Sequence, residues 1–212
     1  MSNAIYNKIG EYKVVPVIAI DDVDKALPLA DVLIESGLPI AEITFRTAAA
    51  EKVIEILKKE RPQLFIGAGT ILNIEDLRKA KNCGAEFGVA PGFNPVIVQE
   101  ALKLKFPFSP GIMTPSDIEG ALTLGIHVLK YFPAEAAGGL KYLNSIYGPY
   151  AHTGVRFMPS GGINKNNAAD YISSKAVLAI GGTWIATRTD ISTGNWKSIK
   201  SNCREILSIL RE

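Results

Sequence analysis

Short apolar segments alternate with amphipathic stretches along the whole chain. The apolar segments are rich in Val, Ile and Phe, and each has the length of a buried strand. The eight predicted strands are Val14–Ile20, Ala41–Arg46, Phe65–Ile71, Phe87–Gly92, Phe106–Ile112, His127–Pro133, Arg156–Ile163 and Val177–Trp184. Continuously apolar strands separated by helices predict a parallel sheet that is covered on both faces.

The stretches between these strands have the periodicity of helices that bury one face. The segment Val23–Ser36 is an example, with apolar residues three and four positions apart. These residues are Ala26, Leu27, Ala30, Leu33 and Ile34. Residues 2–10 precede the first strand and are expected to form an extra helix or lead-in segment.

Several helix starts can be read from capping residues. Asn94 and Thr114 each precede a proline, which is favoured at the first position of a helix. Asn73 lies before Asp76 in a similar capping arrangement.

The spacing of the strands favours a compact (β/α)8 TIM barrel with a short N-terminal lead-in helix. The chain has 212 residues and no linker or shift in composition, so residues 1–212 are expected to form a single α/β domain. Roughly 25 residues are available for each βα unit, close to the minimum for such a barrel. An open doubly wound sheet would more often carry a GxGxxG motif after its first strand, and Ala19–Asp22 contains no glycine.

Composition narrows the classes of function. Lys and Arg number 23 against 21 Asp and Glu, and this near-balance argues against a nucleic-acid-binding protein. The two cysteines, Cys83 and Cys203, are too few and too far apart for a disulfide framework or a zinc site. No apolar run has the length of a membrane helix, and no signal peptide is recognisable, so we expect a cytoplasmic protein.

Lys130 is the one lysine that lies within an apolar predicted strand. It alternates with Val128 and Phe132, so these three side chains are expected on one face. If that face is the barrel interior, desolvation favours the neutral amine that a Schiff-base lysine requires. The alternative is a lysine that reaches out of the strand end or pairs with a buried carboxylate.

Glu42, Thr44 and Arg46 share one face of the second predicted strand. The helix-facing side of such a strand must be apolar, so these side chains are expected to point inward. A carboxylate and a guanidinium there would suit a general base and an anion clamp. The alternative is a structural ion pair of Glu42 with Arg46 or Lys130.

Paired glycines at the ends of the last two predicted strands indicate an anion site. Gly161-Gly162 and Gly181-Gly182 allow backbone N–H groups to approach a phosphate, with a helix N-terminus behind them. The loops after strands seven and eight are the usual phosphate site of a (β/α)8 barrel. Two tight turns without a ligand remain the alternative.

Other polar residues give weaker indications. His127 and His152 have no second ligand at metal-binding spacing, so we expect no metal site. Glu135, at the end of the Lys130 strand, either orients the Lys130 region or caps the loop.

Taken together, these segments resemble the class I 2-keto-3-deoxy-6-phosphogluconate (KDPG) aldolases, including those that also act on 4-hydroxy-2-oxoglutarate (KHG). The matching stretches are Val14–Ile18, Glu42–Thr47, Gly67–Thr70, Pro110–Ile112, Lys130–Glu135 and Pro159–Ile163. They occur in the expected order over nearly the whole chain. The Lys130 strand with its Phe-Pro-Ala-Glu continuation is the most specific.

The resemblance implies a role for each of these positions. Lys130 looks like the Schiff-base lysine and Glu42 like the general acid/base. The pyruvyl carboxylate would be bound by Arg46 and Thr70, with Pro91 and Phe132 lining that pocket. The implied phosphate site consists of Gly161, Gly162, Gly181, Gly182 and Thr183. The resemblance also implies a homotrimer that needs neither metal nor cofactor, and whose partner is a phosphorylated 2-keto acid.

Other functions stay open at this point. The preferred substrate of the aldolase could be the gluconate-derived or the galactonate-derived phosphosugar acid, or KHG. The rivals to an aldolase are a phosphosugar isomerase or epimerase and a non-catalytic barrel that binds a phosphosugar.

Overall fold

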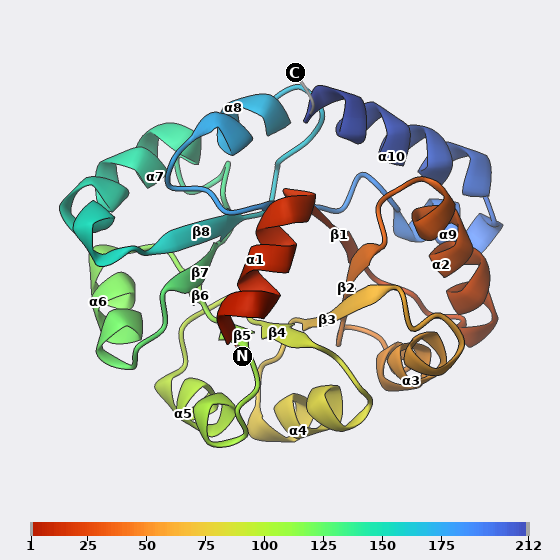
Figure 1. The fold of residues 1–212 in the computed structure, drawn as a ribbon, viewed down its shortest axis with the longest axis horizontal. Coiled ribbons are helices and arrows are strands. Elements are labelled where there is room, and N and C mark those ends of the chain that lie inside the picture. Colours follow the sequence, from red (N-terminus) through yellow and green to blue (C-terminus); the bar gives the residue numbers. More distant parts are fainter. Residues whose placement is uncertain (1, 211–212) are drawn as a thin grey trace.

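The computed structural model describes residues 2–210 and places parallel strands on the inside and helices on the outside (Figure 1). The strands are β1 (Val14–Ile18), β2 (Ile40–Thr44), β3 (Phe65–Gly69), β4 (Phe87–Val89), β5 (Phe108–Ser109), β6 (Gly111–Ile112), β7 (Val128–Tyr131), β8 (Arg156–Pro159) and β9 (Ile180–Gly182). Each apolar segment of the sequence overlaps at least one of them, so the predicted strand positions are confirmed.

The helices alternate with these strands and bury their apolar faces against them. They are α1 (Ser2–Tyr12), α2 (Ala26–Glu35), α3 (Ala50–Glu60), α4 (Ile74–Asn82), α5 (Pro95–Lys103), α6 (Pro115–Thr123), α7 (Gly139–Tyr147), α8 (Ala168–Ser173), α9 (Arg188–Thr193) and α10 (Trp196–Ile209), with 3-10 turns at Val23–Lys25 and Gly148–Thr153. In α2 the predicted core residues Ala26, Ala30 and Leu33 are buried. None of the helices within residues 2–210 is long and apolar enough to cross a membrane.

The prediction of a closed eight-stranded barrel is wrong. The hydrogen-bonded strands form a six-stranded sheet of order β5-β4-β3-β2-β1-β9 and a separate three-stranded sheet of order β6-β7-β8. Between β8 and β9 only isolated bridges occur, such as the one that joins Ser160 to Gly181.

Two local breaks explain why the strands do not form one continuous ladder. Pro110 interrupts the predicted strand Phe106–Ile112, and a proline has no N–H group to donate. The two short strands on either side of Pro110 pair with different neighbours in the ring: β5 pairs with β4, and β6 pairs with β7. At the other break, Gly161 and Gly162 follow β8 with φ of 93° and 86°, outside the range of a regular strand. Periodicity shows where strands occur, but not where a ladder between them is interrupted.

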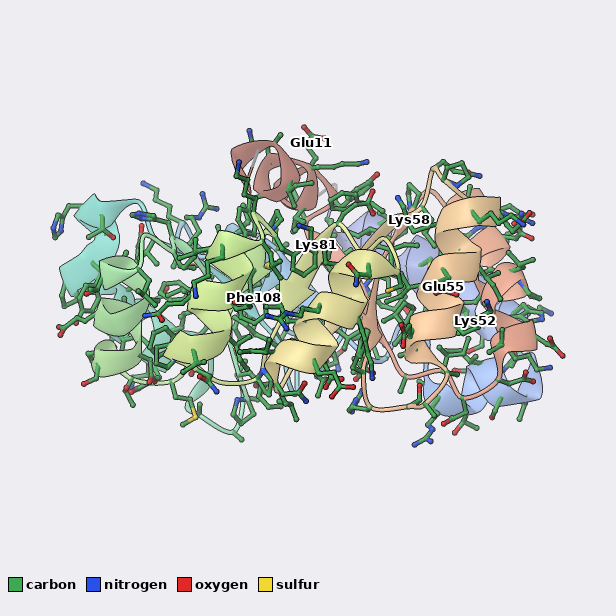
Figure 2. All side chains as sticks on the ribbon, turned by 90° about the horizontal axis from the view of Figure 1, so that it is seen from below. Glu11, Lys52, Glu55, Lys58, Lys81 and Phe108 are labelled. Carbon is green, nitrogen blue, oxygen red and sulfur yellow. The ribbon has the colours of Figure 1, made fainter. Side chains whose placement is uncertain are left out.

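Helix α1 confirms the expected lead-in helix and lies across the amino ends of the strands. It runs over the centre of the ring in Figure 1 and stands above one end of the outer helices in Figure 2. Ile9 is fully buried, and Tyr6 Oη accepts a hydrogen bond from Ser109 Oγ over 3.2 Å. Helix α1 covers the amino ends of the strands and leaves their carboxyl ends accessible. The carboxyl ends are the side on which the site of a (β/α) fold is expected.

The predicted helix caps are confirmed. The side chains of Asn73 and Asn94 accept hydrogen bonds from the first turns of α4 and α5. Thr114 and Asp117 form a reciprocal capping box at the start of α6. Burial alone would raise the pKa of Asp117, but hydrogen bonds from the Met113 and Thr114 N–H groups and the Thr114 hydroxyl together lower it.

Replacing Asp117 with Ala is expected to lower the free energy of unfolding by about 1 kcal/mol at neutral pH, the usual contribution of a cap. Because the pKa of Asp117 is lowered on folding, its contribution is present above the ordinary value of about 3.9 and is lost as the pH falls through the lower folded value. Urea unfolding at neutral pH and at about pH 3 measures both effects. Ser116→Ala, at an exposed position of the same turn, is the control.

Candidate active site

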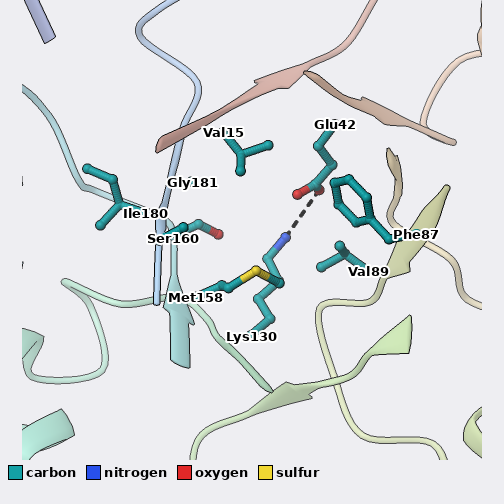
Figure 3. A pocket seen from close by; sticks show the side chains of 10 residues that line it. Val15, Glu42, Phe87, Val89, Lys130, Met158, Ser160, Ile180 and Gly181 are labelled. Carbon is teal, nitrogen blue, oxygen red and sulfur yellow. Dashed lines mark hydrogen bonds and ion pairs between the residues drawn. The ribbon is translucent and has the colours of Figure 1, made fainter. Parts of the chain in front are cut away.

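Lys130 and Glu42 meet in the interior of the ring of strands. Lys130 projects from β7 and Glu42 from β2 on the opposite side, and the two side chains point toward each other (Figure 3). The Lys130 Nζ and Glu42 Oε1 atoms are 3.4 Å apart, and the two side chains are only 8% and 6% exposed. The inward orientation predicted for both residues is therefore observed.

Glycines on the neighbouring strand make room for this contact. In β3, Gly67 lies opposite Glu42 and Gly69 opposite Thr44. A Cβ atom on Gly69 would collide with Glu42 Oε1, and one on Gly67 would collide with the ring of Phe87. Any larger residue at position 69 would push the carboxylate away from Lys130, so Gly69 fixes the place of Glu42.

A small cavity of about 10 Å³ adjoins the pair, which is space for about one water molecule. Its lining consists of Val15, Glu42, Phe87, Val89, Lys130, Met158, Ser160, Ala179, Ile180 and Gly181. Most of these residues are apolar, and Figure 3 shows Phe87, Val89 and Met158 around the pair. A charged group in these surroundings is poorly solvated. The Lys130 amine and the Glu42 carboxylate therefore depend on each other for electrostatic stabilisation.

Arg46 lies outside the strand on which its inward orientation was predicted. The strand β2 ends at Thr44, and Arg46 lies beyond this end with an exposed side chain. Its Nε donates a hydrogen bond over 3.2 Å to Thr44 Oγ1, which itself donates to the Ile18 carbonyl. The guanidinium is thus tethered through Nε at the strand end, and its terminal nitrogens make no hydrogen bond within residues 2–210.

The other residues expected around a bound carboxylate lie at neighbouring strand ends and do not line the small cavity. Thr70 directly follows β3 with a φ of 60°, an uncommon conformation for a residue other than glycine. Lys130 Nζ lies 5.4 Å from the centre of the Phe132 ring. The carbonyl of Pro91 packs so closely against Gly111 that a Cβ atom there would collide with it.

The two glycine pairs come together at the ends of β8 and β9. The bridge between Ser160 and Gly181 joins the two segments. Within residues 2–210, the backbone N–H groups of Gly161, Gly162 and Thr183 have no hydrogen-bond acceptor. Adjacent unpaired N–H groups are a suitable site for an anion.

The helix N-termini expected directly behind these glycines are not found there. The helices that follow, α8 and α9, begin only at Ala168 and Arg188. Each is a short helix of 6 residues. The backbone N–H groups of the loops, rather than helix dipoles, are therefore what the structure offers to an anion.

The structure places one residue in the site and one beside the glycine loop that sequence reasoning did not select. Ser160 is buried and lines the cavity. The Tyr171 hydroxyl on α8 donates a hydrogen bond to the carboxylate of Glu135. Burial, and to a smaller extent this hydrogen bond, raises the pKa of Tyr171, so the hydroxyl keeps its proton. No signal in the sequence links Tyr171 to Glu135, because the contact arises only from packing.

Glu135 connects the end of the Lys130 strand to the glycine loop. Its backbone N–H donates to the Gly161 carbonyl over 3.0 Å, and a Cβ on Gly162 would lie 2.6 Å from Glu135 Cβ. Of the two roles considered for Glu135, these contacts agree with capping of the loop.

Residues 2–210 contain no cluster of three His, Cys, Asp or Glu side chains that could hold a metal ion. Cys83 and Cys203 are buried free thiols, and burial raises the pKa of each to about 11. The thiolate form, which would be the reactive one, is therefore disfavoured at both positions.

The substitution Gly69→Ala is expected to displace the Glu42 carboxylate and to destabilise the protein by about 1–3 kcal/mol through overpacking. Urea unfolding together with a crystal structure of the variant would measure both consequences. Gly92→Ala is the control, because a Cβ atom at Gly92 has no neighbour within 4 Å. Wild-type stability and an unmoved Glu42 in Gly69→Ala would contradict the steric argument.

Comparison with known proteins identifies close relatives over nearly the full length. The family model described as KDPG and KHG aldolase matches residues 5–202. The chain is 45% identical to the 2-dehydro-3-deoxy-phosphogluconate aldolase of Haemophilus influenzae, covering 98% of this chain and 97% of the relative. It is 38% identical to the KHG/KDPG aldolase of Escherichia coli, covering 91% and 89% of the two chains.

A solved structure extends this similarity to three dimensions. The KDPG aldolase of Legionella pneumophila, crystallised with pyruvate captured at low pH as a covalent carbinolamine intermediate, superposes with a TM-score of 0.90. The two sequences are 34% identical, and the match covers 96% of this chain and 97% of the other.

Proposed function

The chain belongs to the KDPG and KHG aldolase family, and from this premise we propose that its buried Lys130 and Glu42 catalyse the Schiff-base cleavage of 2-dehydro-3-deoxy-6-phosphogluconate. The enzyme is a carbon–carbon lyase, and its products are pyruvate and glyceraldehyde 3-phosphate. The observation that carries the assignment of residues is the 3.4 Å contact between Lys130 Nζ and Glu42 Oε1 in an apolar interior.

The first half of the reaction forms the imine. The neutral amine of Lys130 attacks the C2 keto carbon of the substrate and gives a carbinolamine, whose hydroxyl leaves as water. Glu42, within hydrogen-bond reach of the amine, takes up and returns the protons that these steps require. The product is a protonated imine between Nζ and C2.

The second half breaks the C3–C4 bond. Glu42 removes the proton of the C4 hydroxyl, the bond electrons move into the imine, and glyceraldehyde 3-phosphate leaves with C4 as its aldehyde carbon. The remaining enamine takes a proton at C3. Addition of water to the resulting imine releases pyruvate and restores the free amine of Lys130.

The two ends of the substrate would be bound on either side of this pair. Arg46, tethered by Thr44 at the end of β2, is suited to bind the carboxylate with its free guanidinium donors. Thr70, Pro91 and Phe132 would complete the pyruvyl pocket. The N–H groups around Gly161–Gly162 and Gly181–Thr183 would bind the phosphate. Anchoring both ends aligns the scissile bond with Lys130.

The short loops at the strand ends support a broader substrate range. KHG carries the same 2-keto acid and C4 hydroxyl with a carboxylate in place of the phosphorylated tail, so the same pair can cleave it to pyruvate and glyoxylate. The family and its relatives favour the gluconate-derived substrate over the galactonate-derived one, and an aldolase over an isomerase or a non-catalytic barrel. A lactate dehydrogenase-coupled assay on all three acids measures the preference.

Borohydride reduction in the presence of pyruvate tests the Schiff base directly. Intact-mass analysis is expected to find one covalent pyruvate-derived adduct, and peptide mapping is expected to locate it on Lys130. Lys130→Met should give no adduct, whereas Lys141→Met, an exposed lysine of α7, should react like the wild type. An adduct on another lysine, or none at all, would refute the proposal.

Glu42→Gln is expected to lower kcat for KDPG cleavage at least about a hundredfold, the usual contribution of a general acid/base. The amide retains the shape of the carboxylate but does not accept the C4 proton. Steady-state kinetics would measure the loss, with Glu55→Gln at an exposed position of α3 as the control. Near-normal turnover of Glu42→Gln would assign the acid/base role to another group.

We further propose that the enzyme is a homotrimer and that it works in the cytoplasm, where phosphorylated sugar acids occur. The support is an unusual exposure of Leu72, Val96 and Met113, which are 58%, 58% and 41% exposed. They follow β3, β4 and β6 at the same rim of the strands. Large apolar side chains of this kind are typical of an interface between subunits.

Val96→Asp is expected to shift the sedimentation coefficient from that of a trimer to that of a monomer, since it places a charge in the proposed interface. Gln99→Asp, an exposed position further along the same helix, is the control. A wild-type protein that sediments as a monomer would dismiss the trimer.

A further inference from the structure

A second, larger cavity lies at the opposite end of the strands from the substrate-facing residues. Its volume is about 640 Å³, within the usual range for small-molecule sites. It is bounded by Tyr6 of α1, by the end of α5, and by residues at the amino ends of β5, β7 and β8. We call it the α1 groove. It shares no lining residue with the cavity beside Lys130 and Glu42.

The charged and titratable side chains of the α1 groove include three nitrogen bases and no acid. Lys105, His127 and Arg156 line it, and no Asp or Glu side chain does so within residues 2–210. Tyr6 does not add negative charge, because burial raises its pKa to about 12. The groove is therefore complementary to an anion.

Arg156 is held in a fixed position in the lining of the α1 groove. One terminal nitrogen of its guanidinium donates to the Val177 carbonyl, which holds the side chain in place. The Nε atom is buried and has no hydrogen-bond partner within residues 2–210. The other terminal nitrogen makes no hydrogen bond within residues 2–210 and is not among the buried unpaired atoms, so it is the donor that Arg156 can offer to an acceptor oxygen of a ligand.

The remaining lining is largely apolar. Leu102, Phe106 and Leu178 are among the side chains that form it, and Leu102 is 45% exposed. An inorganic ion would leave this apolar surface in contact with water, whereas a flat hydrocarbon body would cover it. The lining thus favours an organic anion over a free phosphate.

We propose that the α1 groove is a second ligand site that binds a small organic anion, with its acidic head against Arg156 and Lys105 and an apolar body against Leu102, Phe106 and Leu178. The head can be a carboxylate, a phosphate or a sulfonate, which share the acceptor oxygens that the site requires. This site is separate from the aldolase reaction and requires none of its residues.

The test uses 2-naphthoate as the probe and the neutral 2-naphthamide as its matched analogue. Isothermal titration calorimetry on the wild-type enzyme is expected to detect saturable binding of 2-naphthoate, and binding at least about tenfold weaker for the amide, because a charge-assisted hydrogen bond is lost. A saturating concentration of pyruvate should leave naphthoate binding unchanged.

Variants then locate the binding. Arg156→Met should weaken naphthoate binding at least about tenfold, and Arg156→Lys should bind more tightly than Arg156→Met. Lys105→Met should also weaken naphthoate binding, and because Lys105 is exposed this variant should fold like the wild type. Lys103→Met, at the end of α5 and outside the groove, is the control. Pyruvate release from KDPG should remain at the wild-type rate in all four variants.

The outcomes that overturn the proposal are distinct. They are an absence of saturable binding, equal binding of acid and amide, competition by pyruvate, or unchanged affinity in Lys105→Met and Arg156→Met. If Leu102→Glu dissociates an oligomer and the wild type binds no naphthoate, the groove is covered by a second copy of the chain, and the proposal is wrong.

Discussion

The contact between Lys130 and Glu42 in an apolar interior is the constraint on which the rest of this structure depends. Two ionisable groups far apart in the sequence share a space with few other polar atoms, so each would be costly without the other. The surrounding strands accommodate this pair with small residues, and Gly69 is the clearest case. The same closeness that stabilises the pair also allows the amine and the carboxylate to exchange protons.

The breaks in strand pairing affect which backbone N–H groups can bind a ligand. Pro110 and the Gly161–Gly162 turn break the hydrogen bonding on either side of β6-β7-β8, the sheet that carries Lys130. At the second break the N–H groups of Gly161 and Gly162 have no acceptor among residues 2–210, and such groups are suited to an anion. A continuous ladder would have used its N–H groups for strand pairing. At the Gly161–Gly162 turn, the loss of regular strand pairing therefore leaves backbone donors without an acceptor within residues 2–210.

The sequence was sufficient for the strand positions, the helix caps and the inward orientation of Lys130 and Glu42. All three depend on local rules, namely hydrophobic periodicity, side-chain hydrogen bonding to the first helical turn, and alternation along a strand. Closure of the barrel was predicted wrongly, because it depends on hydrogen bonds between segments distant in the chain. Arg46 lies two residues past the end of β2, which is at Thr44, so the alternation along the strand does not extend to it. The contact of Tyr171 with Glu135 and the α1 groove likewise arise from tertiary packing alone.

The missing side chain at Gly69 also has a consequence for how this enzyme can change over time. The volume that a side chain at position 69 would fill is occupied by the side chain of Glu42, which is longer than an aspartate would be. Positions 42 and 69 therefore restrict each other sterically. A glutamate at position 42 disfavours alanine at 69, whereas an aspartate would withdraw the carboxylate toward β2 and free that volume. The two positions are therefore expected to covary among related sequences, and any redesign of the acid has to begin on the neighbouring strand.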